Sequence, residues 1–211
     1  MNLFLKDPAA CAYPGNPVLN DLIYGWGNEA WSGREELLAG CIEHALISKG
    51  AILECGSGLT TVLLGVIAKQ QGQSHWVLEH KPEWAKKVRK YVTLYGLDSV
   101  ICASPLKDYG EYCWYDTSFE RLPDRFSLVV CDGPPSRTKG GRYGLAPVMG
   151  GRLNPGCAIL LDDAGRPAEL EIAQRWQNEL NAPFNVRGLN KPYIKMTLGF
   201  QCITSSQVKP N

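Results

Sequence analysis

The sequence predicts an α/β domain built around a mostly parallel sheet. Short apolar runs of the strand type alternate with longer segments of helical periodicity along most of the chain. The chain has 211 residues, of which 45% are hydrophobic and 20% are charged, which is enough to bury the core of one such domain. Strands that alternate with helices are typical of parallel sheets whose faces are covered by helices.

The composition of the chain indicates which partners and which cellular compartment to expect. The formal net charge is +1, so charge gives no reason to expect a nucleic-acid or membrane partner. No apolar run reaches the roughly 18 residues of a spanning helix, and the stretch before Lys6 is too short for a signal peptide. None of the eight cysteines forms a CxxC pair. We therefore expect reduced thiols and a cytoplasmic protein.

Three regions are expected along the chain. Residues 1–31 are rich in Pro, Gly, Asn and aromatic residues, which predicts an arm of loops or short helices that acts as a lid. Ser32 and Glu35 have the spacing of a capping box, so a helix is expected to begin at Ser32. We assign residues 32–204 to the main domain and residues 205–211 to a frayed tail.

Within the main domain, strands and helices are expected in regular order. Strands are predicted at 51–55, 74–80, 99–103, 126–132 and 156–163, with a final pair at 184–190 and 193–203. Helices are predicted after the first strand at 60–70, from Pro82, and from Pro167, with a short one after the fourth strand. Residues 104–125 form a long connection without an assigned strand or helix.

Acidic side chains cluster where the predicted strands end. They are Glu54, Glu79, Asp132, Asp162 and Asp163. In a parallel sheet the carboxyl ends of the strands share one edge, and ligands bind in the crevice outside it. One such acid alone is explained as a helix cap, but five of them predict a binding or catalytic site.

The turn after the first strand, in ILECGSGLTT, favours one class of ligand over another. Glu54 precedes Gly56 and Gly58, and glycines at such a turn let the backbone approach a ligand closely. A nicotinamide fingerprint, GxGxxG, requires a third glycine where Thr61 stands, and Glu54 would repel its pyrophosphate. S-adenosylmethionine has no phosphate. Its ammonium group and ribose hydroxyls suit acids such as Glu54 and Glu79.

In these motifs the chain resembles the class I, Rossmann-like S-adenosylmethionine-dependent methyltransferases. The resemblance spans roughly residues 33–203 and rests on LECGSGLTT, WVLEH, VVCDGPP and LNPGCAILLDD, in that order. It implies a seven-stranded, mostly parallel sheet in a three-layer sandwich, with an antiparallel last strand. It also implies a set of cofactor-binding residues: Glu54, Gly56, Ser57, Gly58, Thr60, Glu79, Ala103, Ser104 and Asp132.

The second half of the site leaves two mechanisms open. Asp132, Asp162 and Asp163 would repel one another unless they are protonated or bridged, and a hard divalent ion such as Mg²⁺ is a natural bridge. Some small-molecule and sugar O-methyltransferases of this class place a magnesium-type ion at these positions, but Pro134 and Pro135 depart from their pattern. In the alternative, Asp132 acts alone as a general base and Asp163 caps the helix that follows.

Cationic and aromatic side chains suggest how a substrate is held. The loop SRTKGGRYG carries three cationic residues, Arg137, Lys139 and Arg142, and Arg166 follows the fifth strand. These cations suit a lid that closes on an anionic or polyhydroxyl substrate. Alternatively, they belong to a solvated surface loop. Among these groups we assign catalytic roles to Asp132, Asp163, Arg142 and Arg166. The aromatic residues Trp26, Trp31 and Trp114 are expected either in a substrate pocket or in the core.

The sequence thus predicts methyl transfer from S-adenosylmethionine to a hydroxyl of a small molecule or glycan, with assistance by a divalent ion left open. A nicotinamide-dependent oxidoreductase is the alternative within enzymes. A catalytically inactive cofactor-binding module that serves interactions is the alternative outside catalysis. The methyl acceptor and the oligomeric state remain open at this point.

Overall fold

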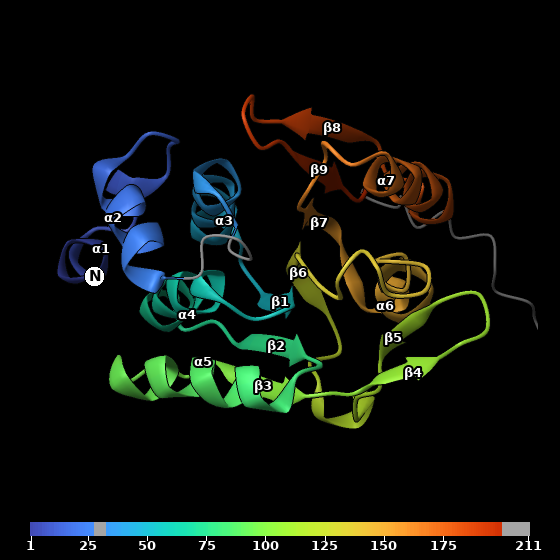
Figure 1. Cartoon of the computed structure of the whole chain (residues 1–211), viewed down its shortest axis with the longest axis horizontal. Helices are drawn as coiled ribbons and strands as arrows, with labels where there is room; N and C mark the ends of the chain where they lie inside the picture. The colour runs from blue at the N-terminus through green and yellow to red at the C-terminus, as the bar shows by residue number, and fades with distance from the viewer. Residues whose placement is uncertain (28–32, 200–211) are drawn as a thin grey trace, which may run out of the picture.

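The computed structural model describes residues 1–27 and 33–199 (Figure 1). The helices are α1 Asn2–Lys6, α2 Pro17–Trp26, α3 Glu35–Ile47, α4 Leu59–Gln71, α5 Pro82–Leu94, α6 Leu145–Met149 and α7 Pro167–Leu180. The strands are β1 Ala51–Cys55, β2 His75–Glu79, β3 Val100–Ala103, β4 Leu106–Asp108, β5 Cys113–Tyr115, β6 Phe126–Cys131, β7 Leu153–Leu161, β8 Phe184–Arg187 and β9 Tyr193–Thr197.

Seven strands form one sheet in the order β3-β2-β1-β6-β7-β9-β8. Neighbouring strands from β3 to β7 are parallel, and β9 runs antiparallel to both β7 and β8. The predicted fold class, with its antiparallel last strand, is therefore confirmed. The register pairs Cys55 with both Leu78 and Cys131, and Cys131 with Leu161, so the segments that follow these strands meet at one edge.

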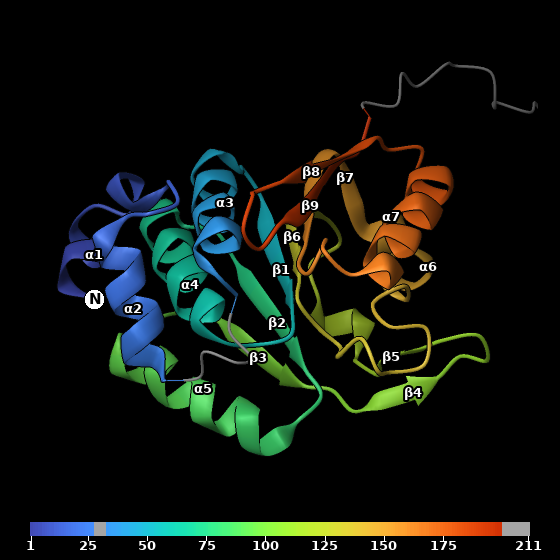
Figure 2. The same ribbon diagram turned by 45° about the horizontal axis from the view of Figure 1, so that its top comes forward.

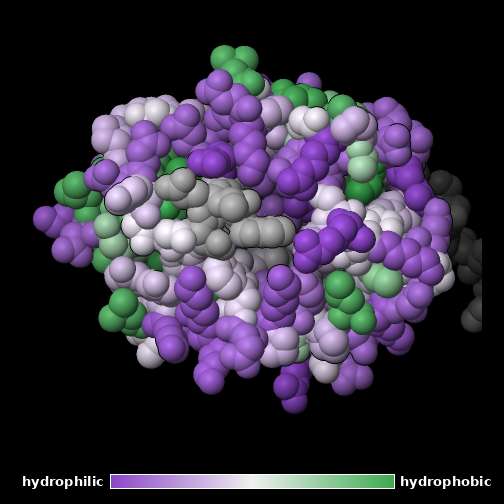
Figure 3. All heavy atoms as spheres, in the orientation of Figure 1, coloured by the Kyte–Doolittle hydropathy of each residue, from purple (hydrophilic) through white to green (hydrophobic). Residues whose placement is uncertain are grey.

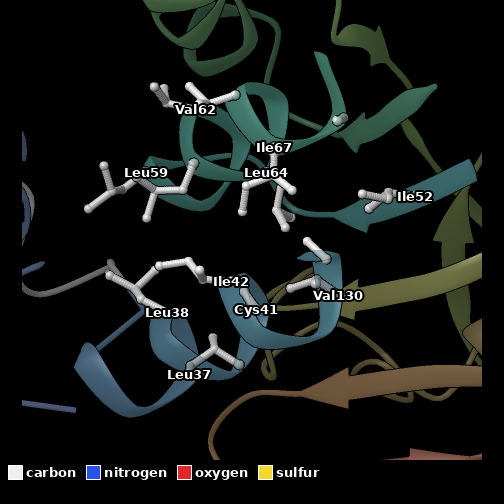
Figure 4. Packing of buried hydrophobic residues seen from close by; sticks show 14 of the residues in the cluster. Leu37, Leu38, Cys41, Ile42, Ile52, Leu59, Val62, Leu64, Ile67 and Val130 are labelled. Atoms are coloured by element: carbon white, nitrogen blue, oxygen red, sulfur yellow. The ribbon is translucent and has the colours of Figure 1, made fainter. Parts of the chain in front are cut away.

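Two hydrophobic clusters cover the two faces of the sheet, as the three-layer arrangement requires. Figures 1 and 2 show α3, α4 and α5 on one side, and α6, α7 and the β4–β5 hairpin on the other. On the first side, side chains of α3 and α4 meet above Ile52 of β1 and Val130 of β6 (Figure 4). The apolar periodicity of the sequence identified these helices correctly.

The described part of the N-terminal arm is helical and packed. Helices α1 and α2 lie outside α3 and α4, away from the sheet (Figures 1 and 2). Asn16 caps α2 by accepting from the backbone N–H groups of Val18 and Leu19. Phe4 and Trp26 are buried in the same cluster as α3 and α4. These residues therefore extend one face of the core.

Helix α3 begins later than the capping-box pattern predicts. Its first helical residue is Glu35 and its N-cap is Arg34, whereas the expected N-cap, Ser32, lies outside the described residues. Oε2 of Glu35 accepts a hydrogen bond of 2.9 Å from the backbone N–H of Gly15 in the arm. The carboxylate of Glu35 thus holds the N-terminal segment.

The long connection between β3 and β6 contains a small antiparallel pair, β4–β5, that the sequence did not predict. Each strand has only three residues, too few for a recognisable alternation. The hairpin contacts the loop after β6: the N–H of Cys113 donates to the carbonyl of Lys139, whose ammonium lies 3.1 Å from Asp108. It thereby supports the loop that carries Arg142.

The face of the molecule drawn in Figure 3 is dominated by hydrophilic residues, with the hydrophobic ones in small separate groups. Among the described helices, none combines the length and the apolar character needed to cross a bilayer. The seven cysteines within the described ranges are free thiols, and Cys202 lies outside them.

Candidate functional site

A cavity of about 270 Å³ opens at the edge of the sheet where the parallel strands end. Its walls come from the turn after β1, the ends of β2, β6 and β7, the start of α5, and the segment before β9. Tyr115 of the hairpin also lines it. The cavity has two chemically different halves, one around Ser57 and Glu79 and one around Asp132, Asp162 and Asp163.

The glycine turn after β1 is shaped by the neighbouring strand. Gly56 has a φ of +86°, and a Cβ built there would lie 2.9 Å from the backbone nitrogen of Gly133. The carbonyl of Cys55 accepts from the N–H groups of Asp132 and Gly133, at 3.0 and 2.7 Å. Gly56 therefore allows the segments after β1 and β6 to touch each other. Gly56 also lines the cavity, so the close approach of a ligand suggested by the sequence stays a prediction.

Gly58 does not line the cavity, but the space beside it is open among the described residues. It is the N-cap of α4, and a Cβ built on it meets no heavy atom of the described residues within 4 Å. Its N–H donates to Oγ1 of Thr61 at 3.0 Å, so Thr61 stabilises the start of the helix. The two glycines of the motif thus have different surroundings. Gly56 packs against Gly133 and lines the cavity, whereas Gly58 borders open space among the described residues.

Glu79, at the end of β2, holds the turn from the other side. Its Oε2 accepts from both the N–H and the hydroxyl of Ser57, at 3.0 and 2.8 Å. Its Oε1 accepts from the N–H of Lys81 at 2.9 Å and lies 3.2 Å from Nδ1 of His80. Burial alone would raise the pKa of Glu79, but these hydrogen bonds together lower it. Glu79 is thus a stable carboxylate at the wall of the cavity.

Trp84 completes this half of the cavity. Its indole N–H donates to the carbonyl of Ser57 at 2.7 Å, and its ring packs edge-on against Trp26 of α2. Lys87 lies over the same ring at 4.6 Å. The sequence analysis did not single out Trp84, although its place two residues after the Pro82 that opens α5 puts it near the end of β2.

Two predicted cofactor residues lie behind the turn and do not line the cavity. Glu54 is fully buried, accepts a hydrogen bond from the hydroxyl of Thr60, and lies 3.3 Å from Nε2 of His75. His75 in turn contacts the hydroxyl of Ser99 at 2.9 Å. Glu54 and Thr60 therefore support the turn from beneath, and their assignment to cofactor binding stays a prediction.

The residues after β3 are also displaced from the cavity. Ser104 is buried, and its N–H donates to the carbonyl of Glu79 at 2.8 Å. Ala103 pairs with Glu79 in the sheet and is exposed. Neither residue lines the cavity, and their assignment to cofactor binding stays a prediction.

The second half of the cavity is built on three carboxylates. One oxygen of each of Asp132, Asp162 and Asp163 lies within 4.8 Å of the others. Asp132 follows β6, and the other two follow β7, so the pairing of these strands brings them together. Asp163 adopts a φ of +64°, and its carboxylate points into the cluster. The alternative role of Asp163 as a helix cap is therefore not seen, and Arg166 is the N-cap of α7.

Arg142 holds this acid cluster from beneath. One terminal nitrogen, Nη2, contacts Oδ1 of Asp132 at 3.1 Å and Oδ2 of Asp163 at 2.9 Å. The other, Nη1, donates to the carbonyl of Asp162 at 2.9 Å and lies 3.5 Å from Glu169. Only 3% of the Arg142 side chain is exposed. This arginine is thus a buried counter-ion, which excludes the solvated-loop alternative for it.

Burial and neighbouring charges shift the pKa values of Asp132 and Arg142 in this cluster. Burial raises the pKa of Asp132 well above its usual range, and the nearby carboxylates of Asp162 and Asp163 raise it further, while Arg142 and Lys191 oppose the rise. The side chain keeps 27% of its surface accessible, but it lies at the bottom of the cavity with protein atoms around it. Burial alone would lower the pKa of Arg142, but Asp132, Glu169 and Asp163 raise it, so the guanidinium stays charged.

Two further cations reach the cluster from the cavity side. Arg166 donates to Oδ2 of Asp163 at 2.8 Å and to the hydroxyl of Ser136 at 2.8 Å. Lys191 lies 3.6 Å from both Asp162 and Asp163. The sequence analysis missed Lys191, because only the return of the chain from β8 to β9 brings it near β7. It also missed Glu169, a buried carboxylate that accepts from Ser136 at 2.6 Å.

The other cationic and aromatic residues predicted from the sequence do not gather at the cavity. Lys139 pairs with Asp108 of the hairpin, and Arg137 is exposed outside the cavity. Trp114 is fully buried in the core on the α7 side, and Trp26 is buried near α5. Trp31 lies outside the described residues. The lid expected from the three loop cations is therefore reduced to Arg142, which is already closed against the acids.

Comparison with known proteins identifies the fold. No family model and no curated protein matches the sequence. An SAH-bound methyltransferase from Podospora anserina is 15% identical, with coverage of 94% of this chain and 96% of that chain and a TM-score of 0.63. An O-methyltransferase from Bacillus cereus, in complex with SAH, is 10% identical, with coverage of 93% and 96% and a TM-score of 0.57.

A third similar structure is that of an RNA methyltransferase. It is a 16S rRNA N2 G1207 methyltransferase from T. thermophilus in complex with AdoMet and guanosine, 17% identical, with a TM-score of 0.56. The match covers 78% of this chain but only 42% of that one. Together with the strand order and the position of the cavity, these likenesses lead to one conclusion: the chain has the Rossmann-like fold of class I S-adenosylmethionine-dependent methyltransferases.

Proposed function

We propose that this protein transfers a methyl group from S-adenosylmethionine to a hydroxyl group of a small molecule or glycan. The observation that carries the proposal is the juxtaposition of two different carboxylates in one cavity. Glu79 is a hydrogen-bonded carboxylate beside an open glycine turn, and Asp132 has a raised pKa and faces the same space. The first suits a binding role, and the second suits proton transfer.

The cofactor would lie against Ser57, Gly58 and Glu79. The ribose of S-adenosylmethionine offers two hydroxyls, which can donate to the carboxylate of Glu79 within the cavity. Ser57 and Trp84 fix the backbone beside it, and the space next to Gly58 admits the ligand without a clash. Glu54, Thr60 and His75 act at a distance, because their contacts keep the turn in one conformation.

Asp132 would accept the proton of the acceptor hydroxyl. The acceptor oxygen attacks the methyl carbon in line with the carbon–sulfur bond, whose electron pair goes to sulfur and leaves a neutral thioether. The positive sulfur already activates the methyl group, so alignment supplies much of the rate. Arg142 holds Oδ1 of Asp132, which orients the carboxylate toward the cavity. A base whose pKa is raised toward the working pH is better matched to this proton transfer.

The acceptor half of the cavity mixes both signs of charge at short range. Asp162 and Asp163 stand beside Lys191 and Arg166, so acceptors and donors of hydrogen bonds alternate around the space. Such a set pairs readily with the hydroxyls of a sugar or another polyhydroxyl compound, each of which both donates and accepts. This supports a hydroxylated acceptor over a strongly apolar one.

A divalent ion fits this cluster poorly as it stands. The three carboxylates are close enough to share one. However, Arg142, Arg166 and Lys191 already supply three positive charges at contact distance. The repulsion that made a bridging ion attractive is thereby relieved by side chains. We therefore propose transfer with Asp132 as the base and derive no step through a metal.

Ligand-dependent melting tests the cofactor assignment. S-adenosylhomocysteine should raise the melting temperature through its binding to the folded state, and NAD should not. Calorimetric titration of the same two ligands gives the affinities. Stabilisation by NAD alone would contradict the proposal and favour the oxidoreductase alternative.

Methyl transfer itself is tested with a labelled methyl donor. Wild-type protein is incubated with a panel of sugars, phenols and catechols, with amines and ribosomal RNA as comparison acceptors. Label should enter a hydroxylated compound and be lost in Asp132→Asn. Label that enters only amines or RNA would overturn the acceptor class while leaving the cofactor assignment in place.

A further inference from the structure

Lys191 occupies an unusual position at the acid cluster. It lies on the segment that joins β8 to β9, and its ammonium is 3.6 Å from Oδ2 of Asp162 and 3.6 Å from Oδ1 of Asp163. About a third of its side chain, 34%, is exposed, and it forms part of the cavity wall. Lys191 thus places a positive charge between the two acids on the side that faces the cavity.

The backbone that carries this lysine is fixed by Glu36 at the start of α3. The carboxylate of Glu36 accepts from the N–H groups of Leu189, Asn190 and Lys191, the last at 2.6 Å. Gly188 has a φ of +88°, and a Cβ there would lie 3.0 Å from the Glu36 carboxyl carbon, so a glycine permits this approach. Three hydrogen bonds to a buried acid anchor the backbone at the base of the side chain.

Arg142 and Lys191 contact different oxygens of the cluster. Arg142 takes Oδ2 of Asp163 from the buried side, and Lys191 faces Oδ1 of the same residue. In Asp162, Oδ1 is buried and has no hydrogen-bond partner among the described residues. Arg142 therefore holds the carboxylates of Asp132 and Asp163, while Lys191 faces Oδ2 of Asp162 and Oδ1 of Asp163. An unpaired buried carboxylate oxygen there is the kind of ligand that a hard cation takes.

A divalent ion and the Lys191 ammonium would compete for this space. An ion bound to Oδ1 of Asp163 at about 2.1 Å, the usual distance for Mg²⁺, must lie within about 6 Å of an ammonium that is 3.6 Å from that oxygen. Like charges that close, in a partly enclosed site, repel strongly. The anchoring by Glu36 limits how far the lysine backbone can retreat.

We infer that Lys191 is a tethered cation that takes the place of a divalent ion at the Asp132–Asp162–Asp163 cluster, so that its removal turns the cluster into a metal site. The inference concerns the same cavity as the proposed function but rests only on the positions of charged groups. It can therefore be tested without cofactor or methyl acceptor, and it can fail while the methyltransferase proposal stands.

The test is binding of Mn²⁺, which prefers carboxylate oxygens and is detected by electron paramagnetic resonance. Wild type, Lys191→Met and Lys191→Arg are titrated with the metal alone. Lys191→Met should bind one Mn²⁺ at least about tenfold more tightly than wild type, because one repelling charge is gone. Lys191→Arg should behave as wild type. Adding Asp162→Asn to Lys191→Met should abolish the new site.

Lys139→Met is the matched control, because it also removes a lysine paired with an aspartate but lies at the hairpin. It should leave Mn²⁺ binding unchanged. Equal affinity in wild type and Lys191→Met, whether tight or weak, would overturn the inference. Lys191→Gln repeats the test with a polar side chain should the methionine variant melt early. Titration of the same proteins with S-adenosylhomocysteine reports separately on the proposed function.

Discussion

Glu79 and Asp132 are both acids at the ends of parallel strands, β2 and β6, that flank β1 in one sheet, yet their surroundings differ. Four hydrogen-bonding or ion-pair contacts, from Ser57, His80 and Lys81, surround the carboxylate of Glu79 and lower its pKa. Asp132 lies among other carboxylates, and its pKa is raised despite Arg142. The same residue chemistry at the same edge thus yields a carboxylate with a lowered pKa in one half of the cavity and one with a raised pKa in the other.

The contrast shows what the strand-end pattern does and does not determine. Parallel pairing brings the acids to one edge, whatever their neighbours. Their roles depend on which polar groups the loops add: N–H and hydroxyl donors around Glu79, and further acids around Asp132. Changing one acid at a time should therefore separate binding from turnover.

The largest effect is expected from Asp132→Asn. The amide cannot accept the acceptor proton, so turnover should fall by about 10²–10⁴-fold, the usual contribution of a general base. Affinity for S-adenosylhomocysteine should remain close to wild type, because Glu79 and the glycine turn are untouched. Initial rates and a calorimetric titration measure the two quantities, with Asp124→Asn as a control at an exposed acid. Loss of turnover and of S-adenosylhomocysteine affinity together would contradict the assignment of catalysis and binding to separate halves of the cavity.

Glu79→Ala should show the opposite pattern at the other half. The ligand loses an ionic acceptor and Ser57 loses its anchor, so binding of S-adenosylhomocysteine should weaken by about 1.5–3 kcal/mol, the scale of hydrogen bonds to a charged group. Calorimetry measures the change. The exposed Glu83→Ala on α5 controls for loss of a negative charge nearby. Unchanged affinity in Glu79→Ala would refute its assignment as the ribose ligand.

Substitutions at Gly56 and Gly58 should separate an effect on stability from an effect on ligand affinity, and both effects should be smaller than those above. Gly56→Ala forces a Cβ against Gly133 at positive φ and should lower the free energy of unfolding by about 1–3 kcal/mol. Gly58→Ala meets open space and has an extended φ of −177°, so stability should hold while ligand affinity falls. Chemical denaturation and calorimetry measure the pair. Equal loss of stability in both variants would contradict these separate roles.

The pH dependence of stability should run in opposite directions for the two acids, and this is the smallest effect. A raised pKa in the folded state means that Asp132 contributes stability at low pH and loses it as the pH rises through that pKa. Asp132→Asn should therefore gain melting temperature relative to wild type as the pH increases. The lowered pKa of Glu79 contributes stability that is lost as the pH falls, so Glu79→Gln should lose most near neutrality. Melting curves across the pH range test both signs.

The fold could be predicted almost completely from the sequence, because its signals are local. Apolar strands such as 126–132 and the prolines at positions 82 and 167 are visible without tertiary structure. The β4–β5 hairpin was missed because its three-residue strands are held by the loop near Lys139 and lack a pattern of their own. The start of α3 was predicted too early, and Glu35 binds the N–H of Gly15, a partner twenty residues earlier that no local pattern indicates.

The site was predictable at its strand ends and much less so between them. Asp132, Asp162 and Asp163 meet as the strand order requires. Whether an acid faces the cavity or the interior depends on partners distant in sequence, and His75 turns Glu54 inward. Lys191 lies still further from any motif, because it reaches the acids only through the turn anchored by Glu36.

The contact between Trp84 and Ser57 has an optical consequence. An indole that donates to the turn after β1 and borders the cavity is a natural fluorophore beside the proposed position of the cofactor. An adenosyl group that binds there should change its emission, whereas Trp114 and Trp176 are fully buried on the other face of the sheet and should respond less. Tryptophan emission should therefore report cofactor occupancy in real time without any label.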